Sequence, residues 1–216
     1  MIDFFDNYII AITGPSGSGK TTLGNNLIKE YEISIPCHCT TRLRRSDDIE
    51  GFYRYLTHEE YSYFLDNDQF LISSGDGPFV KKECGNFYGV LISDCIDVIK
   101  SFNTIILFVS YKDLYQLTNL QQLGFNIDIV NLTFLDIKKS VRERLIGNIS
   151  RNHSESDIES RIINAIKDQE TYGELLEEVS STKVYTDILN EKETYEKVCS
   201  DLQLERKKLV RKRIIY

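Results

Sequence analysis

The hydrophobic pattern of this 216-residue chain alternates between short apolar runs and longer amphipathic stretches. Residues 8–12 and 104–109 are almost continuously apolar, which is typical of strands buried on both faces of a sheet. The clearest amphipathic stretch is 157–178. One face of it collects Ile158, Ile162, Ala165, Ile166, Tyr172 and Leu175. The alternation predicts an α/β fold in which a parallel sheet is flanked by helices.

The remaining elements follow in the same way. We expect strands at 32–37, 69–72, 86–91, 126–132 and 183–186, and helices at 22–29, 58–65, 93–101, 113–123, 136–145 and 194–213. Because residues 40–89 are polar and break the alternation, we interpret them as part of an inserted lobe. The expected division is a core of 1–39, 91–146 and 157–216, a lobe of 40–90, and a mobile lid of 147–156.

A glycine-rich segment directly follows the first apolar run. Residues 13–22 read TGPSGSGKTT and fit the pattern G-x-x-x-x-G-K-[ST] of the P-loop. Such a loop directs its backbone N–H groups toward phosphate at a helix N-terminus. Lys20 would reach the β- and γ-phosphates, and the Thr21 hydroxyl would bind Mg²⁺. The segment predicts a P-loop NTPase fold and ATP contacts from Gly14, Ser16, Gly17, Ser18, Gly19, Lys20, Thr21 and Thr22.

Composition narrows the class of protein. The net charge of −7 argues against general nucleic-acid binding. No apolar run is long enough to span a membrane and no signal peptide is evident, so we expect a cytoplasmic protein without a membrane partner. Five unevenly spaced cysteines do not form a disulfide framework, and Cys37-His38-Cys39 lacks the second pair of a tetrahedral metal site. Monomer and homodimer both stay open.

Residues 40–55, TTRLRRSDDIEGFYRY, contain four arginines. Such a cluster has two interpretations. Composition alone favours a solvated basic face. In a P-loop protein the same arginines could instead clamp a second phosphate in line with the γ-phosphoryl group, because guanidinium groups match phosphate oxygens bidentately.

Together, several ordered motifs over about residues 8–201 resemble guanylate kinase. They are Gly14 to Leu23, Thr40-Thr41-Arg42 with Arg45, Gly51 with Tyr53, Gly85 to Gly89, Arg144-Leu145, and Arg161. The resemblance implies an ATP-dependent kinase that uses Mg²⁺ and moves the γ-phosphoryl group to a nucleoside monophosphate, with GMP as the first candidate. It also implies residue roles. The acceptor phosphate would be held by Arg42, Arg45, Tyr53 and Tyr88, and the transferring group would be neutralised by Lys20, Arg144, Arg151 and Arg161.

The positions that read guanine in the family are altered here. A serine, a glutamate, a Ser/Thr and two aspartates are replaced by His38, Ile72, Val90, Phe108 and Ser110. Aligning the glutamate from the Tyr88 side gives Phe79 instead, with Glu83 nearby. Three alternatives follow: GMP read by other groups on the extra loop, a different monophosphate or small phosphorylated metabolite, or a non-catalytic relative that binds a partner through the lobe. A hypothesis from a different class is a nucleotide-gated module that binds through the basic segment 206–213.

Overall fold

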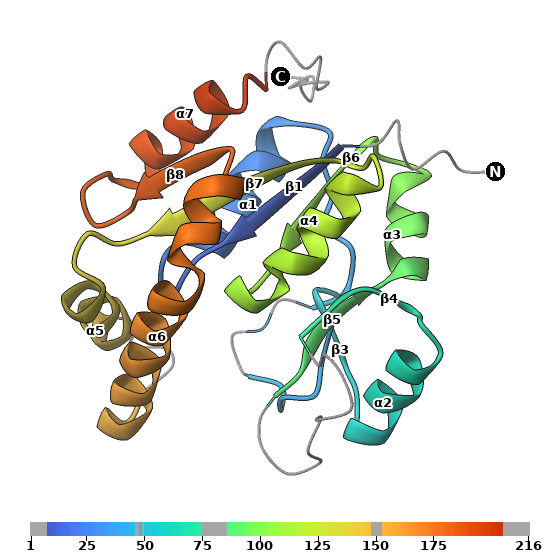
Figure 1. Ribbon diagram of the computed structural model, residues 1–216, viewed down its shortest axis with the longest axis horizontal. Coiled ribbons are helices and arrows are strands. Elements are labelled where there is room, and N and C mark those ends of the chain that lie inside the picture. The colour runs from blue at the N-terminus through green and yellow to red at the C-terminus, as the bar shows by residue number, and fades with distance from the viewer. Residues whose placement is uncertain (1–7, 46–47, 49, 75–85, 148–152, 205–216) are drawn as a thin grey trace.

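The computed structural model describes residues 8–45, 48, 50–74, 86–147 and 153–204 (Figure 1). Its first sheet contains four strands in the order β6-β1-β7-β8, and all neighbouring pairs are parallel. The strands are β1 (Tyr8–Thr13), β6 (Thr104–Phe108), β7 (Asn126–Thr133) and β8 (Thr182–Tyr185). Every residue of β1 is buried. The predicted parallel sheet is therefore confirmed, with the first apolar run at its centre.

Helices cover both faces of this sheet. One face carries α1 (Lys20–Glu30) and α7 (Glu191–Asp201), and the other carries α3 (Ile92–Ile99), α4 (Leu114–Gln122) and α6 (Glu155–Val179). Because successive side chains of a strand point to opposite faces, Ile10 packs with Leu27 of α1 while Ile9 joins the core under α4. In Figure 1, α4 and α6 lie in front of the sheet and α1 lies behind it. Helix α5 (Ile137–Gly147) packs against α6.

A second, mixed sheet has the order β3-β2-β5-β4. It contains β2 (His38–Thr40), β3 (Tyr53–Tyr55), β4 (Phe70–Ser73) and β5 (Tyr88–Leu91). Strand β2 pairs parallel with β3 and antiparallel with β5. Helix α2 (His58–Asp66) begins at a capping box formed by Thr57 and Glu60. Figure 1 shows this sheet and α2 below the first sheet. The predicted strands 69–72 and 86–91 and helix 58–65 are thus confirmed.

Two predicted elements differ from the structure. The strand expected at 32–37 is wrong, since Ser34 makes only an isolated bridge to Ile105 and β2 begins at His38. Pro36 has no N–H to give to a ladder, which explains the late start. The last helix begins earlier than expected, at the Asn190 capping box, and ends at Asp201. Gln203 then adopts a positive φ of 52°, which breaks the predicted helix before 205–216, a segment outside the described residues.

Candidate phosphoryl-transfer site

The loop between β1 and α1 approaches neighbouring elements closely at its glycines. Gly14 has a φ of 147°, and a Cβ there would lie 2.1 Å from the carbonyl oxygen of Leu132 in β7. Gly17 has a φ of 79°, and its Cβ would lie 2.9 Å from the Cβ of Arg144 in α5. Side chains at these positions would clash and strain the backbone. The glycines therefore allow the predicted loop to pack closely against both β7 and α5.

Lys20, the first residue of α1, folds its side chain back over this loop. Its Nζ donates to the carbonyl oxygens of Gly14 at 2.7 Å and Pro15 at 2.9 Å. Burial lowers the pKa of this amine to about 8. Thr21 and Thr22 follow in the exposed first turn of α1. All eight predicted ATP-contacting residues therefore lie in one continuous loop and helix start.

Two of the predicted catalytic arginines reach this region from distant parts of the chain. Arg144 of α5 donates through Nη2 to the carbonyl oxygen of Thr186 at 2.6 Å. Arg161 of α6 donates through Nη1 to Ser16 Oγ at 3.0 Å, and Asp157 accepts from its Nε at 3.0 Å. Both guanidinium groups therefore lie beside the phosphate-binding loop. The third predicted arginine, Arg151, lies outside the described residues.

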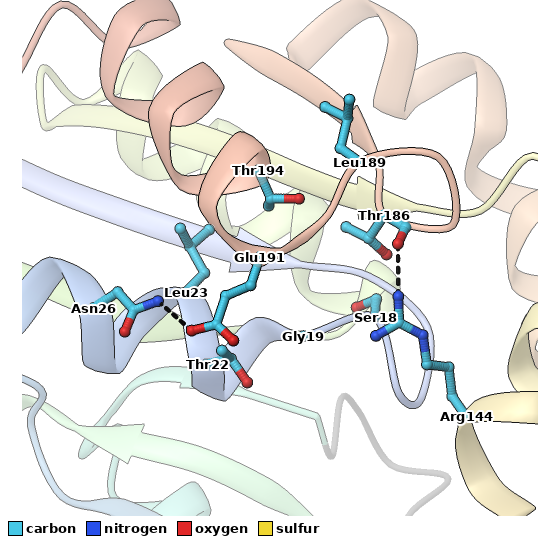
Figure 2. A pocket seen from close by; sticks show the side chains of 10 residues that line it. All are labelled: Ser18, Gly19, Thr22, Leu23, Asn26, Arg144, Thr186, Leu189, Glu191 and Thr194. Carbon is cyan, nitrogen blue, oxygen red and sulfur yellow. Dashed lines mark hydrogen bonds between the residues drawn. The ribbon is translucent and has the colours of Figure 1, made fainter. Parts of the chain in front are cut away.

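A cavity of about 100 Å³ lies between the start of α1 and the segment that joins β8 to α7 (Figure 2). We call it the α1–α7 cavity. Its lining residues are Ser18, Gly19, Thr22, Leu23, Asn26, Arg144, Thr186, Leu189, Glu191 and Thr194. Asn26 donates to Glu191 at 2.8 Å, which ties the two helices together. The sequence analysis missed the part of this wall that follows β8, because no local motif marks it.

A second cavity, of about 230 Å³, lies where the two sheets meet, and we call it the inter-sheet cavity. It is lined by Gly14, Lys20, His38, Tyr53, Ile72, Ser74, Tyr88, Gly89, Val90, Phe108, Val109, Ser110 and Asp113. The cavity thus joins Lys20 to two of the four predicted acceptor-phosphate residues, Tyr53 and Tyr88. The five residues that the sequence analysis expects at the guanine-reading positions, His38, Ile72, Val90, Phe108 and Ser110, also lie on its walls.

His38 shows how these walls differ from a polar base-reading surface. Its Nδ1 lies 2.9 Å from the carbonyl oxygen of Pro36, and its Nε2 accepts from the backbone N–H of Phe108 at 3.2 Å. The ring stacks on Phe52 with a centroid distance of 5.5 Å. Burial lowers the pKa of His38 to about 4, so the ring is neutral at pH 7. Since both nitrogens are engaged, His38 offers the cavity mainly a carbon surface.

Arg42 is held by an ion pair that the sequence analysis did not anticipate. Its guanidinium bonds to both carboxylate oxygens of Asp48, at 2.7 and 2.6 Å, and each side chain is only 5% exposed. The backbone N–H of Arg45 and the hydroxyl of Tyr55 donate to the same carboxylate at 2.7 and 2.6 Å. The Arg42 guanidinium holds the pKa of Asp48 far below its usual range.

The same guanidinium lies 4.6 Å from the ring centroid of Tyr53. Tyr53 and Tyr88 line the inter-sheet cavity, whereas neither Arg42 nor Arg45 does. Tyr53 pairs with His38 at the start of β2, and Tyr88 pairs with Thr40 at its end. Of the four predicted acceptor-phosphate residues, only the tyrosines face the cavity in this structure.

Asp113 is a further residue that the sequence analysis did not single out. It ends the short helix η2 (Tyr111–Asp113), and its Oδ2 accepts from the backbone N–H and the hydroxyl of Ser110 at 2.8 and 2.9 Å. It is the only acidic residue among the described residues that line the inter-sheet cavity. The signal in the sequence was the Ser-x-x-Asp spacing directly after an apolar strand.

Comparisons with known proteins agree with this geometry. A family model described as guanylate kinase matches residues 7–203. The guanylate kinase of Prochlorococcus marinus is 31% identical over 140 residues, which cover 64% of this chain and 72% of that protein. That of Fusobacterium nucleatum is 27% identical over 165 residues, which cover 75% and 81%. The match to the Bartonella quintana guanylate kinase covers 51% of this chain and 47% of that relative.

A solved structure supports the fold. The crystal structure of guanylate kinase from Anaplasma phagocytophilum superposes with a TM-score of 0.64 and covers 94% of this chain and 87% of that one, at 17% identity. The family model spans nearly the whole chain and includes the phosphate-binding loop, the second sheet and both arginine-bearing helices. The chain therefore belongs to the guanylate kinase family of P-loop, ATP-dependent nucleoside monophosphate kinases.

Proposed function

We propose that this chain transfers the γ-phosphoryl group of ATP to the phosphate of a nucleoside monophosphate, with GMP as the first candidate acceptor. The observation that carries the proposal is the inter-sheet cavity, whose lining includes both Lys20 and the hydroxyl-bearing Tyr53 and Tyr88. A phosphate held by these tyrosines would lie next to the loop that binds the donor phosphates. In-line transfer requires this proximity.

The donor nucleotide fits the other side of the loop. With its phosphates on the N-terminus of α1, the base and sugar of ATP would enter the α1–α7 cavity, which begins at Ser18 and Gly19. Figure 2 shows Arg144 beside this entrance, with its guanidinium held by Thr186. A planar, fixed guanidinium offers a surface on which a purine can stack.

Catalysis would depend on positioning and on charge neutralisation, because the acceptor is already an anionic phosphate oxygen. Lys20, Arg144 and Arg161 supply three cationic groups around the loop. Arg151, outside the described residues, is proposed as a fourth. The hydroxyl of Thr21 fits Mg²⁺ as one hard oxygen ligand, since phosphates and water commonly complete its octahedral shell. When bound, the ion would neutralise phosphate charge.

On the acceptor side, we infer that Arg42 and Arg45 join Tyr53 and Tyr88 around the incoming phosphate. Asp48 keeps the Arg42 guanidinium in a fixed orientation beside Tyr53, and this limits the rotamer entropy lost on binding. The division into a core, an acceptor lobe of residues 40–90 and a lid of residues 147–156 is part of the same proposal.

A second candidate acceptor, another phosphorylated small molecule, is favoured by one observation. His38, Ile72, Val90 and Phe108 present mostly apolar surface to the inter-sheet cavity, and both nitrogens of His38 are engaged with the backbone. A guanine base would therefore find few polar partners on these walls. An acceptor with a smaller or less polar group would have a smaller free-energy cost of desolvation in this cavity.

A coupled assay of ADP release over a panel of nucleoside monophosphates and sugar phosphates tests the proposal. Turnover with GMP above all others supports the first candidate, and turnover with another acceptor supports the second. ATP binding without turnover across the panel would overturn both and favour the binding-module alternative. Arg144→Lys and Arg161→Lys variants should lower kcat by about 10²-fold or more, because bidentate contacts and fixed positions are lost.

A further inference from the structure

One carboxylate on the wall of the inter-sheet cavity has no role in the proposed function. Asp113 is 5% exposed and lines the cavity together with Ser110. We propose that the Ser110–Asp113 pair determines acceptor specificity, by accepting hydrogen bonds from N–H or O–H donors that the acceptor carries away from its phosphate. The inference rests on the proposed function, because it assumes that an acceptor occupies this cavity with its phosphate toward Lys20.

The local fold fixes this carboxylate in place. Strand β6 ends at Phe108, and Ser110 then caps η2 by donating its N–H and its hydroxyl to Asp113 Oδ2. In the following helix, Gln116 bonds the backbone N–H and carbonyl of Ser73 at 3.0 and 2.7 Å. These contacts tie the end of β6 to β4 of the second sheet. Asp113 is therefore a preorganised acceptor at the junction between the sheets.

The surroundings make the contact selective. Ile72, Val90 and Val109 form apolar parts of the same wall, so a hydrogen bond from a ligand donor to the carboxylate would form away from bulk water. Charge-assisted bonds of this type are stronger than neutral ones. A ligand that lacks the donor does not form this bond, and such differences in hydrogen bonding discriminate between substrates.

The lining of the cavity therefore contains groups of two chemical kinds. Lys20 and the tyrosine hydroxyls suit a phosphate, while Asp113 suits donors such as the N1–H and 2-amino group of a guanine or the hydroxyls of a sugar. The structure thus assigns the acceptor to phosphorylated compounds that carry at least one N–H or O–H donor at the end remote from the phosphate.

The test compares wild type, Asp113→Asn and Asp97→Asn with the preferred acceptor of the panel and an analogue that lacks one donor. For GMP that analogue is IMP, which lacks the 2-amino group. Asn keeps an oxygen that can accept from Ser110, so capping is retained. We expect Asp113→Asn to lower kcat/KM for the preferred acceptor by about 10- to 100-fold and leave KM for ATP unchanged.

The ratio of kcat/KM between GMP and IMP should fall toward one in Asp113→Asn. Asp97 lies on α3 with its side chain 72% exposed, and its Asn variant should behave as wild type. Ser110→Ala keeps the carboxylate but removes one of its supporting bonds, so it should change the same ratio less.

An unchanged ratio of kcat/KM between GMP and IMP in Asp113→Asn would overturn the inference and leave the proposed function intact. An equal loss of kcat/KM for ATP and for the acceptor would do the same. If Asp113→Asn does not fold, an unchanged ratio in Ser110→Ala has the same meaning. Failure of the proposed function is distinguishable, because wild type would then turn over no acceptor in the panel.

Discussion

Lys20 is bonded to two carbonyl oxygens of its own loop, and its lowered pKa of about 8 makes phosphate binding measurable as proton uptake. Donor phosphates would stabilise the charged amine and raise this pKa. At pH 8.5 we therefore expect ATP binding to take up a fraction of a proton, and at pH 6.5 almost none at this residue. Calorimetry in buffers of different ionisation enthalpy measures the uptake.

Lys20→Ala is the matched control. It should abolish the uptake at pH 8.5 and lower kcat by about 10²-fold or more, since a cation aimed at the transferring group is lost. An ATP-binding enthalpy that does not depend on the buffer at pH 8.5 in the wild type would contradict the assigned role.

His38 predicts a second pH effect, on stability. Its pKa is about 4 in the folded chain and 6.5 in an ordinary environment, so between these values the unfolded chain binds more protons. The free energy of unfolding should therefore fall as the pH drops from 6.5 to 4, by up to about 3 kcal/mol from this group. Urea unfolding at a series of pH values measures the slope.

A His38→Gln variant keeps an acceptor for the Phe108 N–H but has no proton to gain, so its slope in this pH window should be smaller than that of wild type. His58→Gln, the same substitution at an exposed position on α2, provides the comparison. Equal slopes in all three proteins would show that His38 is not buried as a neutral ring.

Residues in local motifs could be predicted from sequence, whereas those defined by long-range contacts could not. Lys20 and its glycines are neighbours along the chain, so spacing alone identified them. The sequence analysis did not single out Asp48, since its role depends on how Arg42 folds back onto it, and Asp113 was expected only as a helix start. The positions of Asp48 and Asp113 can be read from the sequence, but the side chains and cavities that they contact cannot.

At the scale of elements, the packing of α1 against β6 depends on one glycine. A Cβ at Gly24 would lie 2.6 Å from the ring of Phe108, and that ring is held against His38 and Phe52 at centroid distances of 5.7 and 5.6 Å. Alanine within a helix is ordinarily better than glycine by about 1 kcal/mol. We expect Gly24→Ala to be destabilising instead, by about 1–3 kcal/mol, because the ring cannot move aside freely.

The reverse sign is expected once the ring is removed. In a Phe108→Val background, Gly24→Ala should stabilise the protein by about 1 kcal/mol, as in an ordinary helix. Denaturant unfolding of the four proteins in this double-mutant cycle measures both effects. If Gly24→Ala has the same effect in both backgrounds, the contact does not limit this position.

Most elements followed from periodicity. Strand β3 (Tyr53–Tyr55) was not predicted, and the two predictions that were wrong have physical causes. Helix α6 and strands β1, β6 and β7 are long or strongly apolar, so their patterns are unambiguous. The segment 32–37 has an alternating pattern too, but Pro36 has no N–H for a ladder, and Ser34 makes only an isolated bridge to Ile105 of β6. The end of α7 is set by a single left-handed residue, Gln203, which no pattern marks.

For the whole molecule, we expect the second sheet to move on binding both substrates. Arg161 already contacts Ser16, whereas Arg42 is paired with Asp48 and does not line the inter-sheet cavity. A phosphate in that cavity would draw the segment after β2, which carries Arg42 and Arg45, toward the loop. Small-angle X-ray scattering should give a smaller radius of gyration with a non-hydrolysable ATP analogue and the acceptor together than with neither.

The same measurement with the ATP analogue alone separates two motions. If that ligand produces the full compaction, the acceptor does not drive movement of the second sheet. No change with both ligands, under conditions where binding is saturated, would mean that the sheets already have their closed arrangement.

Fold class was predictable at this scale because strand and helix alternate in the order that a parallel sheet requires. The inter-sheet cavity could not be predicted from the sequence. Its walls include residues from β2, β3, β4, β5 and β6, and the relative placement of these strands is a property of tertiary packing.

The make-up of the inter-sheet cavity has a consequence for how this scaffold could change its chemistry. The loop proposed to bind ATP is one uninterrupted piece of chain, while the inter-sheet cavity also takes side chains from β2, β3, β4, β5 and β6. A library that varies only Ile72, Val90, Phe108 and Ser110 would thus leave the ATP-binding loop itself unaltered. The chain is therefore a suitable starting point for directed evolution toward new phosphorylated acceptors, with the phosphoryl donor unchanged.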